Sequence, residues 1–97
     1  MSLFGHSIKY SQEKHPISSL EIKKMVTTVH NLTLNHGEES AVEKSLIQRK
    51  ESQGGKLSLE NIYEILHKLM QENSISKIDY KKLLQIFVDY YRQTFNV

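Results

Sequence analysis

Apolar residues recur every three or four positions along four stretches of the chain, which is the spacing of an amphipathic α-helix. These stretches cover roughly residues 18–36, 38–52, 58–72 and 76–94. The segments between them are short, and no alternating apolar and polar run of similar length indicates a strand. We therefore predict an all-α fold, a small bundle of about four helices.

Three of these stretches begin with a similar pair of polar residues. Ser18 precedes Glu21, Ser58 precedes Asn61, and Ser76 precedes Asp79, each by three positions. In a capping box the first side chain accepts a backbone N–H and the second reaches back to the first residue. The recurring pattern therefore predicts helix starts rather than a functional repeat, and the Ser58 pair should be the weakest.

The expected helix ends depend on glycines. Gly37 suits the position just after a helix, so it should end the first stretch, with His36 in its last turn. The following Glu38 and Glu39 suit the first turn of the second helix. The segment 52–56, with two adjacent glycines, should break the chain after the second helix and form a flexible connector.

The first seventeen residues lack a helical pattern. We predict an N-terminal extension over residues 1–17 and a single helical domain over 18–97. Within the extension, residues 6–10 are the best candidates for a short strand. Isolated apolar residues, among them Leu3, Phe4 and Ile8, could fold back on the domain.

Composition narrows the classes of function. The chain has 97 residues, a net charge of +2 with neutral histidines, and no cysteine. Disulfides, thiolate metal sites and cysteine nucleophiles are therefore excluded. We expect a cytoplasmic protein, because the sequence shows neither a membrane-spanning apolar run nor a secretory leader.

Metal, cofactor and enzyme chemistry find little support in the residue spacing. The histidines, at positions 6, 15, 30, 36 and 67, include no pair three or four residues apart, so we expect no metal site. The 71–79 connection lacks the acidic ligands of a calcium-binding helix–loop–helix. Carboxylates fall at helix starts or on polar faces. We therefore expect a non-enzymatic protein without a cofactor.

The last helix carries more apolar surface than one core-facing stripe requires. Ile86 and Tyr90 lie beside its stripe, and Tyr63 lies at the edge of the preceding helix. Tyrosine combines an apolar ring with a polar tip and is enriched at interfaces. These three residues are our candidate interface, either with another protein of unknown identity or with a second copy in a homodimer.

A second interpretation is a DNA-binding helix-turn-helix regulator. Helix 76–94 would enter the groove, and Lys77, Lys81, Lys82 and Arg92 would contact the nucleic acid. Residues that read base edges are sparse on this helix, so protein binding is our first interpretation.

In size and helix number the chain resembles small bacterial or phage helical proteins, including bacteriocin immunity proteins; this is a resemblance of architecture. We expect an adaptor, inhibitor, immunity-type or regulatory protein.

Overall fold

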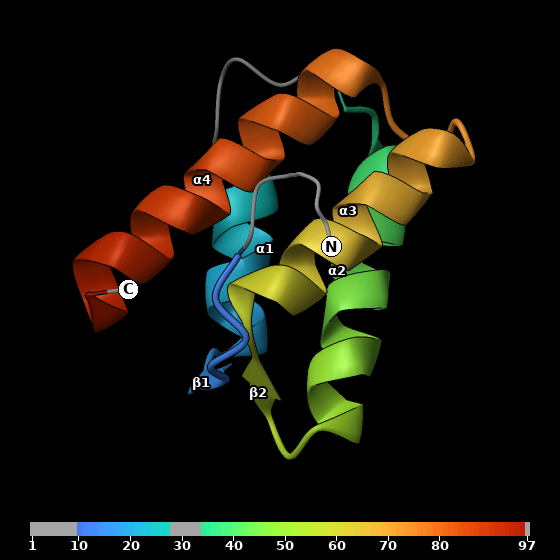
Figure 1. The fold of residues 1–97 in the computed structure, drawn as a ribbon. Helices are drawn as coiled ribbons and strands as arrows, with labels where there is room; N and C mark the ends of the chain where they lie inside the picture. Colours follow the sequence, from blue (N-terminus) through green and yellow to red (C-terminus); the bar gives the residue numbers. More distant parts are fainter. Residues whose placement is uncertain (1–9, 28–33, 97) are drawn as a thin grey trace.

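The computed structural model describes residues 10–27 and 34–96 (Figure 1). Within them lie four helices, α1 (Ser19–Thr27), α2 (His36–Ser52), α3 (Leu59–Gln71) and α4 (Lys77–Phe95), and two short strands, β1 (His15–Pro16) and β2 (Lys56–Leu57). The prediction of an all-α bundle of about four helices is confirmed. The strand pair is an addition that the hydrophobic pattern did not indicate.

At three of the four predicted helix starts a serine acts as an N-terminal cap. The hydroxyl of Ser18 accepts the N–H of Glu21 at 3.1 Å, and that of Ser76 accepts the N–H of Asp79 at 3.0 Å. The pair expected to be weakest forms a complete capping box. Ser58 Oγ accepts the Asn61 N–H, and Asn61 Oδ1 accepts the Ser58 N–H, both at 3.0 Å.

The predicted boundary between the first two helices is wrong. The second helix begins at His36, so His36 and Gly37 lie in its first turn rather than at the end of the preceding helix. Asn35 is the cap: its Oδ1 accepts the Glu38 N–H at 2.8 Å, and Glu38 Oε1 accepts the Asn35 N–H at 2.9 Å. This capping box favours a helix start where the glycine alone indicated an end. Within the rest of the predicted first helix, residues 34 and 35 are not helical, and 28–33 lie outside the described residues.

Part of the predicted N-terminal extension packs on the domain. Strands β1 and β2 are antiparallel, with His15 opposite Leu57 and Pro16 opposite Lys56. The next residue, Ile17, is buried, and its N–H donates to the Gly55 carbonyl at 3.4 Å. Of the strand expected at 6–10, only Tyr10 is described, and it is not in a strand.

The glycine segment after α2, where we expected a flexible connector, forms a hydrogen-bonded turn, and its flexibility stays a prediction. Gly54 and Gly55 have φ angles of 73° and 86°, which favour glycine because it has no Cβ. The N–H of Gly55 donates to the Lys50 carbonyl at 2.7 Å, and β2 follows directly.

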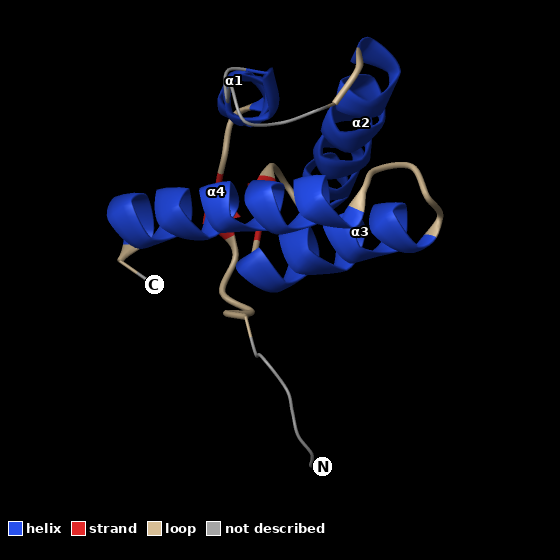
Figure 2. Cartoon of the chain, turned by 90° about the horizontal axis from the view of Figure 1, so that it is seen from above, coloured by secondary structure: helices blue, strands red, loops and turns tan. Residues whose placement is uncertain are grey.

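The helices pack as two crossing pairs around one core. Helix α4 packs mainly on α3, and α1 mainly on α2. Figure 2 shows α3 and α4 side by side, with α1 seen nearly end-on. Among the described residues, no helix combines the length and the apolar character needed to cross a membrane. The buried apolar side chains include Ile17, Ile22, Val26, Val42, Leu46, Leu57, Ile62, Leu66, Ile75, Leu83, Phe87 and Tyr91.

Candidate functional site

Four aromatic rings form a continuous row across three segments of the chain. Tyr10 stacks on Tyr63 of α3 with ring centroids 5.1 Å apart, and Tyr63 stacks on His67 at 5.4 Å. His67 then meets Tyr80 of α4 edge-on at 5.9 Å. Residues four apart lie one above the other on a helix, which explains the contact between Tyr63 and His67. We call these four residues the aromatic surface.

The aromatic surface lies at the boundary between the core and water. All four side chains are half-buried. Burial raises the pKa of the phenols of Tyr10 and Tyr80, and the nearby Tyr63 phenol raises both further. The three tyrosine rings offer apolar area together with hydroxyl groups that bond to water or to another molecule.

A groove adjoins the aromatic surface on the α4 side. Its volume is about 370 Å³, and its walls combine apolar side chains with a lysine and an amide. Lys77, one turn before Lys81 on α4, is exposed and follows the same edge of the helix. The groove therefore has an apolar wall and a basic rim. The residues that line it are Tyr10, Tyr80, Lys81, Leu84, Gln85 and Val88.

The three candidate interface residues do not form one surface. Tyr63 belongs to the aromatic surface. Ile86 and Tyr90 lie on the flank of α4 that faces away from the groove. Successive residues of a helix are turned by about 100°, which places Leu84 on one side of the buried Phe87 and places Ile86 and Tyr90 on the other side. Both are half-buried and pack against the core, and the Tyr90 ring also meets Phe95 edge-on at 6.1 Å.

The candidate DNA contacts are all exposed on α4. At about 100° per residue, Lys77, Lys81 and Arg92 share one flank, whereas Lys82 is turned about 100° from Lys81. Asp89 lies between Arg92 and Lys82 around the helix, and its carboxylate accepts a 2.9 Å hydrogen bond from Gln85. A negative charge on this face opposes contact with phosphates.

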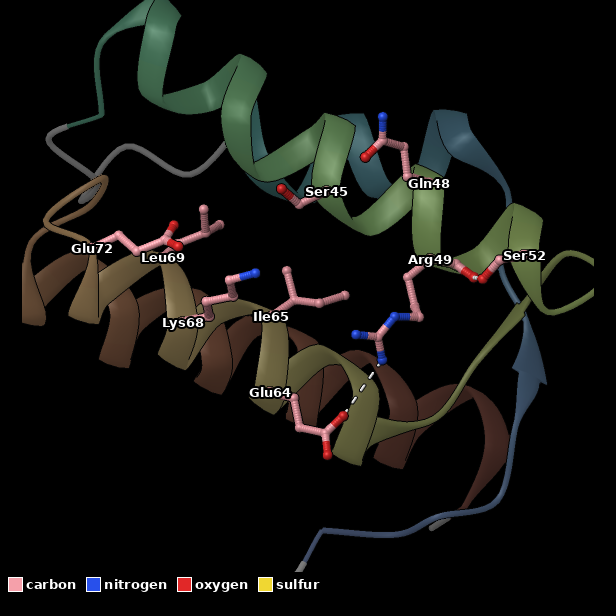
Figure 3. A pocket seen from close by; sticks show the side chains of 9 residues that line it. All are labelled: Ser45, Gln48, Arg49, Ser52, Glu64, Ile65, Lys68, Leu69 and Glu72. Carbon is pink, nitrogen blue, oxygen red and sulfur yellow. Dashed lines mark hydrogen bonds and ion pairs between the residues drawn. The ribbon is translucent and has the colours of Figure 1, made fainter.

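A second groove lies between α2 and α3 (Figure 3). Its volume is about 350 Å³, and Arg49 of α2 reaches Glu64 of α3 across it, with Nη1 and Oε1 3.5 Å apart. Both side chains are partly exposed, so solvent screens the pair and its contribution to stability is small. This groove carries both signs of charge and no aromatic ring. Its other lining residues are Ser45, Gln48, Ser52, Ile65, Lys68, Leu69 and Glu72.

The described histidines occupy separate environments. His67 belongs to the aromatic surface, His15 stacks on Phe95 with centroids 4.2 Å apart, and His36 lies 3.5 Å from Glu39. His6 and His30 lie outside the described residues. Across residues 10–27 and 34–96, no three His, Asp or Glu side chains converge as metal ligands would.

Sequence reasoning found only Tyr63 among the members of the aromatic surface. The spacing of Tyr63 and His67 was a usable signal, because residues four apart share a helix face. The contacts of Tyr10 and Tyr80 with them depend on tertiary packing. Comparisons with models of protein families, with curated proteins and with solved structures give no match to this chain.

Proposed function

We propose that this chain is a small, non-enzymatic interaction module that binds another protein through the aromatic surface and its groove. The observation that supports this function is the continuous row of half-buried rings from Tyr10 to Tyr80. Tyrosine is enriched in the buried centres of interfaces, where its ring supplies contact area and its hydroxyl a hydrogen bond.

The charge beside the groove favours a partner of complementary chemistry. Lys81 lines the groove and Lys77 lies one turn away, so a complementary segment would carry acidic residues next to an apolar or aromatic side chain. The apolar side chain would pack on Tyr80 and Leu84, and the carboxylates would meet the lysines.

Matched tyrosine substitutions test this function. Proteins captured from the native host by the intact chain are identified by mass spectrometry, purified and titrated against each variant. Tyr63→Ala and Tyr80→Ala should each weaken binding by about thirtyfold, as expected for residues at the centre of an interface. Tyr90→Ala is the control, because this tyrosine is also half-buried but lies on the other flank of α4. The affinity of the Tyr90→Ala variant for the partner should stay within about threefold of that of the unsubstituted chain.

Two outcomes would overturn the proposal. Equal losses for the Tyr63, Tyr80 and Tyr90 variants would show that the aromatic surface is not the binding site. Retention on duplex DNA that falls steeply with salt, and is lost on Lys81→Glu, would instead support the DNA-binding interpretation, because phosphate contacts release counterions. Thermal unfolding of each variant verifies that the fold is retained.

A further inference from the structure

The turn between α2 and α3 is organised by the side chain of Gln53. Its Nε2 donates to the Lys56 carbonyl oxygen at 3.0 Å and to Asn61 Oδ1 at 2.8 Å. One amide group thus joins a backbone oxygen of β2 to a side-chain oxygen in the first turn of α3. Asn61 is buried, and its Oδ1 also accepts the N–H of Ser58.

These two oxygens occupy places that a calcium-binding helix–loop–helix uses for its ion. In the EF-hand loop of twelve residues, position 7 supplies a backbone carbonyl, position 12 a side chain, and position 6 is a glycine that makes the sharp turn. If Lys50 is position 1, then Gly55 is position 6, Lys56 is position 7 and Asn61 is position 12. The φ angle of Gly55, 86°, fits such a turn.

The remaining positions of this frame lack the charge that a divalent cation needs. Positions 1, 3 and 5 usually supply ligands to calcium. Here they are Lys50, Ser52 and Gly54, and position 12 is Asn61 rather than the usual glutamate. Positions 1, 3, 5 and 12 therefore supply no carboxylate, and position 1 is a positively charged lysine.

We propose that the Gln53 amide replaces the cation in this loop. Two of its N–H bonds hold the Lys56 carbonyl and Asn61 together, as an ion bound to the same two oxygens would. The unit formed by α2, β2 and α3 therefore keeps one conformation without a divalent cation. This inference uses none of the residues of the aromatic surface, so it can fail while the proposed function holds, and the reverse.

Hydrogen exchange of the backbone amides tests the role of Gln53. Gln53→Ala should speed exchange at Leu57 and Ser58 by about tenfold, because the loop loses both hydrogen bonds of the Gln53 side chain. Gln53→Glu should have at least as large an effect, since it places an acceptor where two acceptors already converge. Gln48→Ala, at an exposed position of α2, the helix that Gln53 directly follows, should leave exchange within about twofold.

A cation titration is the second arm of the test. Amide chemical shifts of the intact chain over residues 50–61 should be the same in excess EDTA and in millimolar calcium or magnesium. A saturable shift in this segment would overturn the proposal, and so would unchanged exchange in Gln53→Ala. Both Gln53 variants could also lose cooperative unfolding while Gln48→Ala keeps it. That result would support the proposal, because it is the extreme form of the loosening that hydrogen exchange measures.

Discussion

The hydroxyl of Tyr91 donates a 2.7 Å hydrogen bond to the carbonyl oxygen of Leu57, which links α4 to β2. Both residues are fully buried. Leu57 lies opposite His15 in the strand pair, and the His15 ring stacks on Phe95 near the end of α4. The two short strands and the C-terminal part of α4 are therefore held together at one place in the fold.

Removal of the Tyr91 hydroxyl should destabilise the protein without changing its fold. Tyr91→Phe removes one donor from the buried Leu57 carbonyl, which still pairs with β1, and the loss of such a hydrogen bond costs about 0.5–1.5 kcal/mol. The free energy of unfolding in urea measures the loss. Tyr90→Phe, a half-buried neighbour, is the control and should change it by less than about 0.5 kcal/mol. Equal losses would show that the hydrogen bond is not the cause.

The protein should lose stability at alkaline pH. Burial, with a smaller effect of the Tyr90 phenol, raises the pKa of Tyr91 far above its ordinary value of 10.0. The unfolded chain releases this proton near pH 10 while the folded chain retains it, so the stabilisation is complete below pH 10 and is lost as the pH rises further. Urea unfolding at several pH values from about 8 to 11 measures the slope. Tyr91→Phe should make it shallower; an unchanged slope would contradict this assignment.

Phe87 of α4 is one of the largest fully buried side chains of the core. Phe87 is completely buried between α4 and the rest of the bundle. Phe87→Ala should cost about 3–5 kcal/mol, through lost burial and the cavity that remains. In a domain of this size such a loss is comparable to the whole stability. Gln93→Ala, at an exposed position of the same helix, should be nearly neutral. A loss below about 1 kcal/mol for Phe87→Ala would mean that the core relaxes around the gap.

The helices were predictable because their signals are local. Apolar spacing identified the buried faces of α3 and α4, and Ser58 and Ser76 identified their starts. The start of α2 was missed because Gly37 and Asn35 give opposing local signals. The chain follows Asn35, whose capping box satisfies two backbone N–H donors at once, those of Glu38 and of Asn35 itself.

The strand pair and most of the aromatic surface were not predictable. His15 pairs with Leu57, and Tyr10 stacks on Tyr63, across long stretches of sequence. Strands of two residues are too short to show an alternating pattern. Only the packing of the helices brings these partners together, so the sequence offered Tyr63 as a site residue but not its neighbours.

The missed cap of α2 leads to a direct test. Asn35→Ala should lower the free energy of unfolding by about 1 kcal/mol, because the N–H of Glu38 loses its acceptor. Asn35→Asp keeps the acceptor and should be close to neutral or slightly stabilising, since a negative charge suits a helix N-terminus. A larger loss for the aspartate than for the alanine would show that the cap does not act through this acceptor. Circular dichroism during urea unfolding follows both variants.

Self-association through Ile86 and Tyr90 remains a prediction, and the structure limits its strength. A large apolar side chain gains about 1.5–3 kcal/mol when it passes from full exposure to full burial. Ile86 and Tyr90 already pack partly against the core, so a second copy would cover only the remainder. We therefore expect a weak homodimer whose sedimentation coefficient rises with concentration over about 10–500 μM. Ile86→Lys combined with Tyr90→Glu should give a folded monomer, whereas Tyr63→Ala, in the aromatic surface on α3, should leave the dimer intact. A monomer across this range for the unsubstituted chain would make the homodimer prediction wrong and would assign Ile86 and Tyr90 to the core alone.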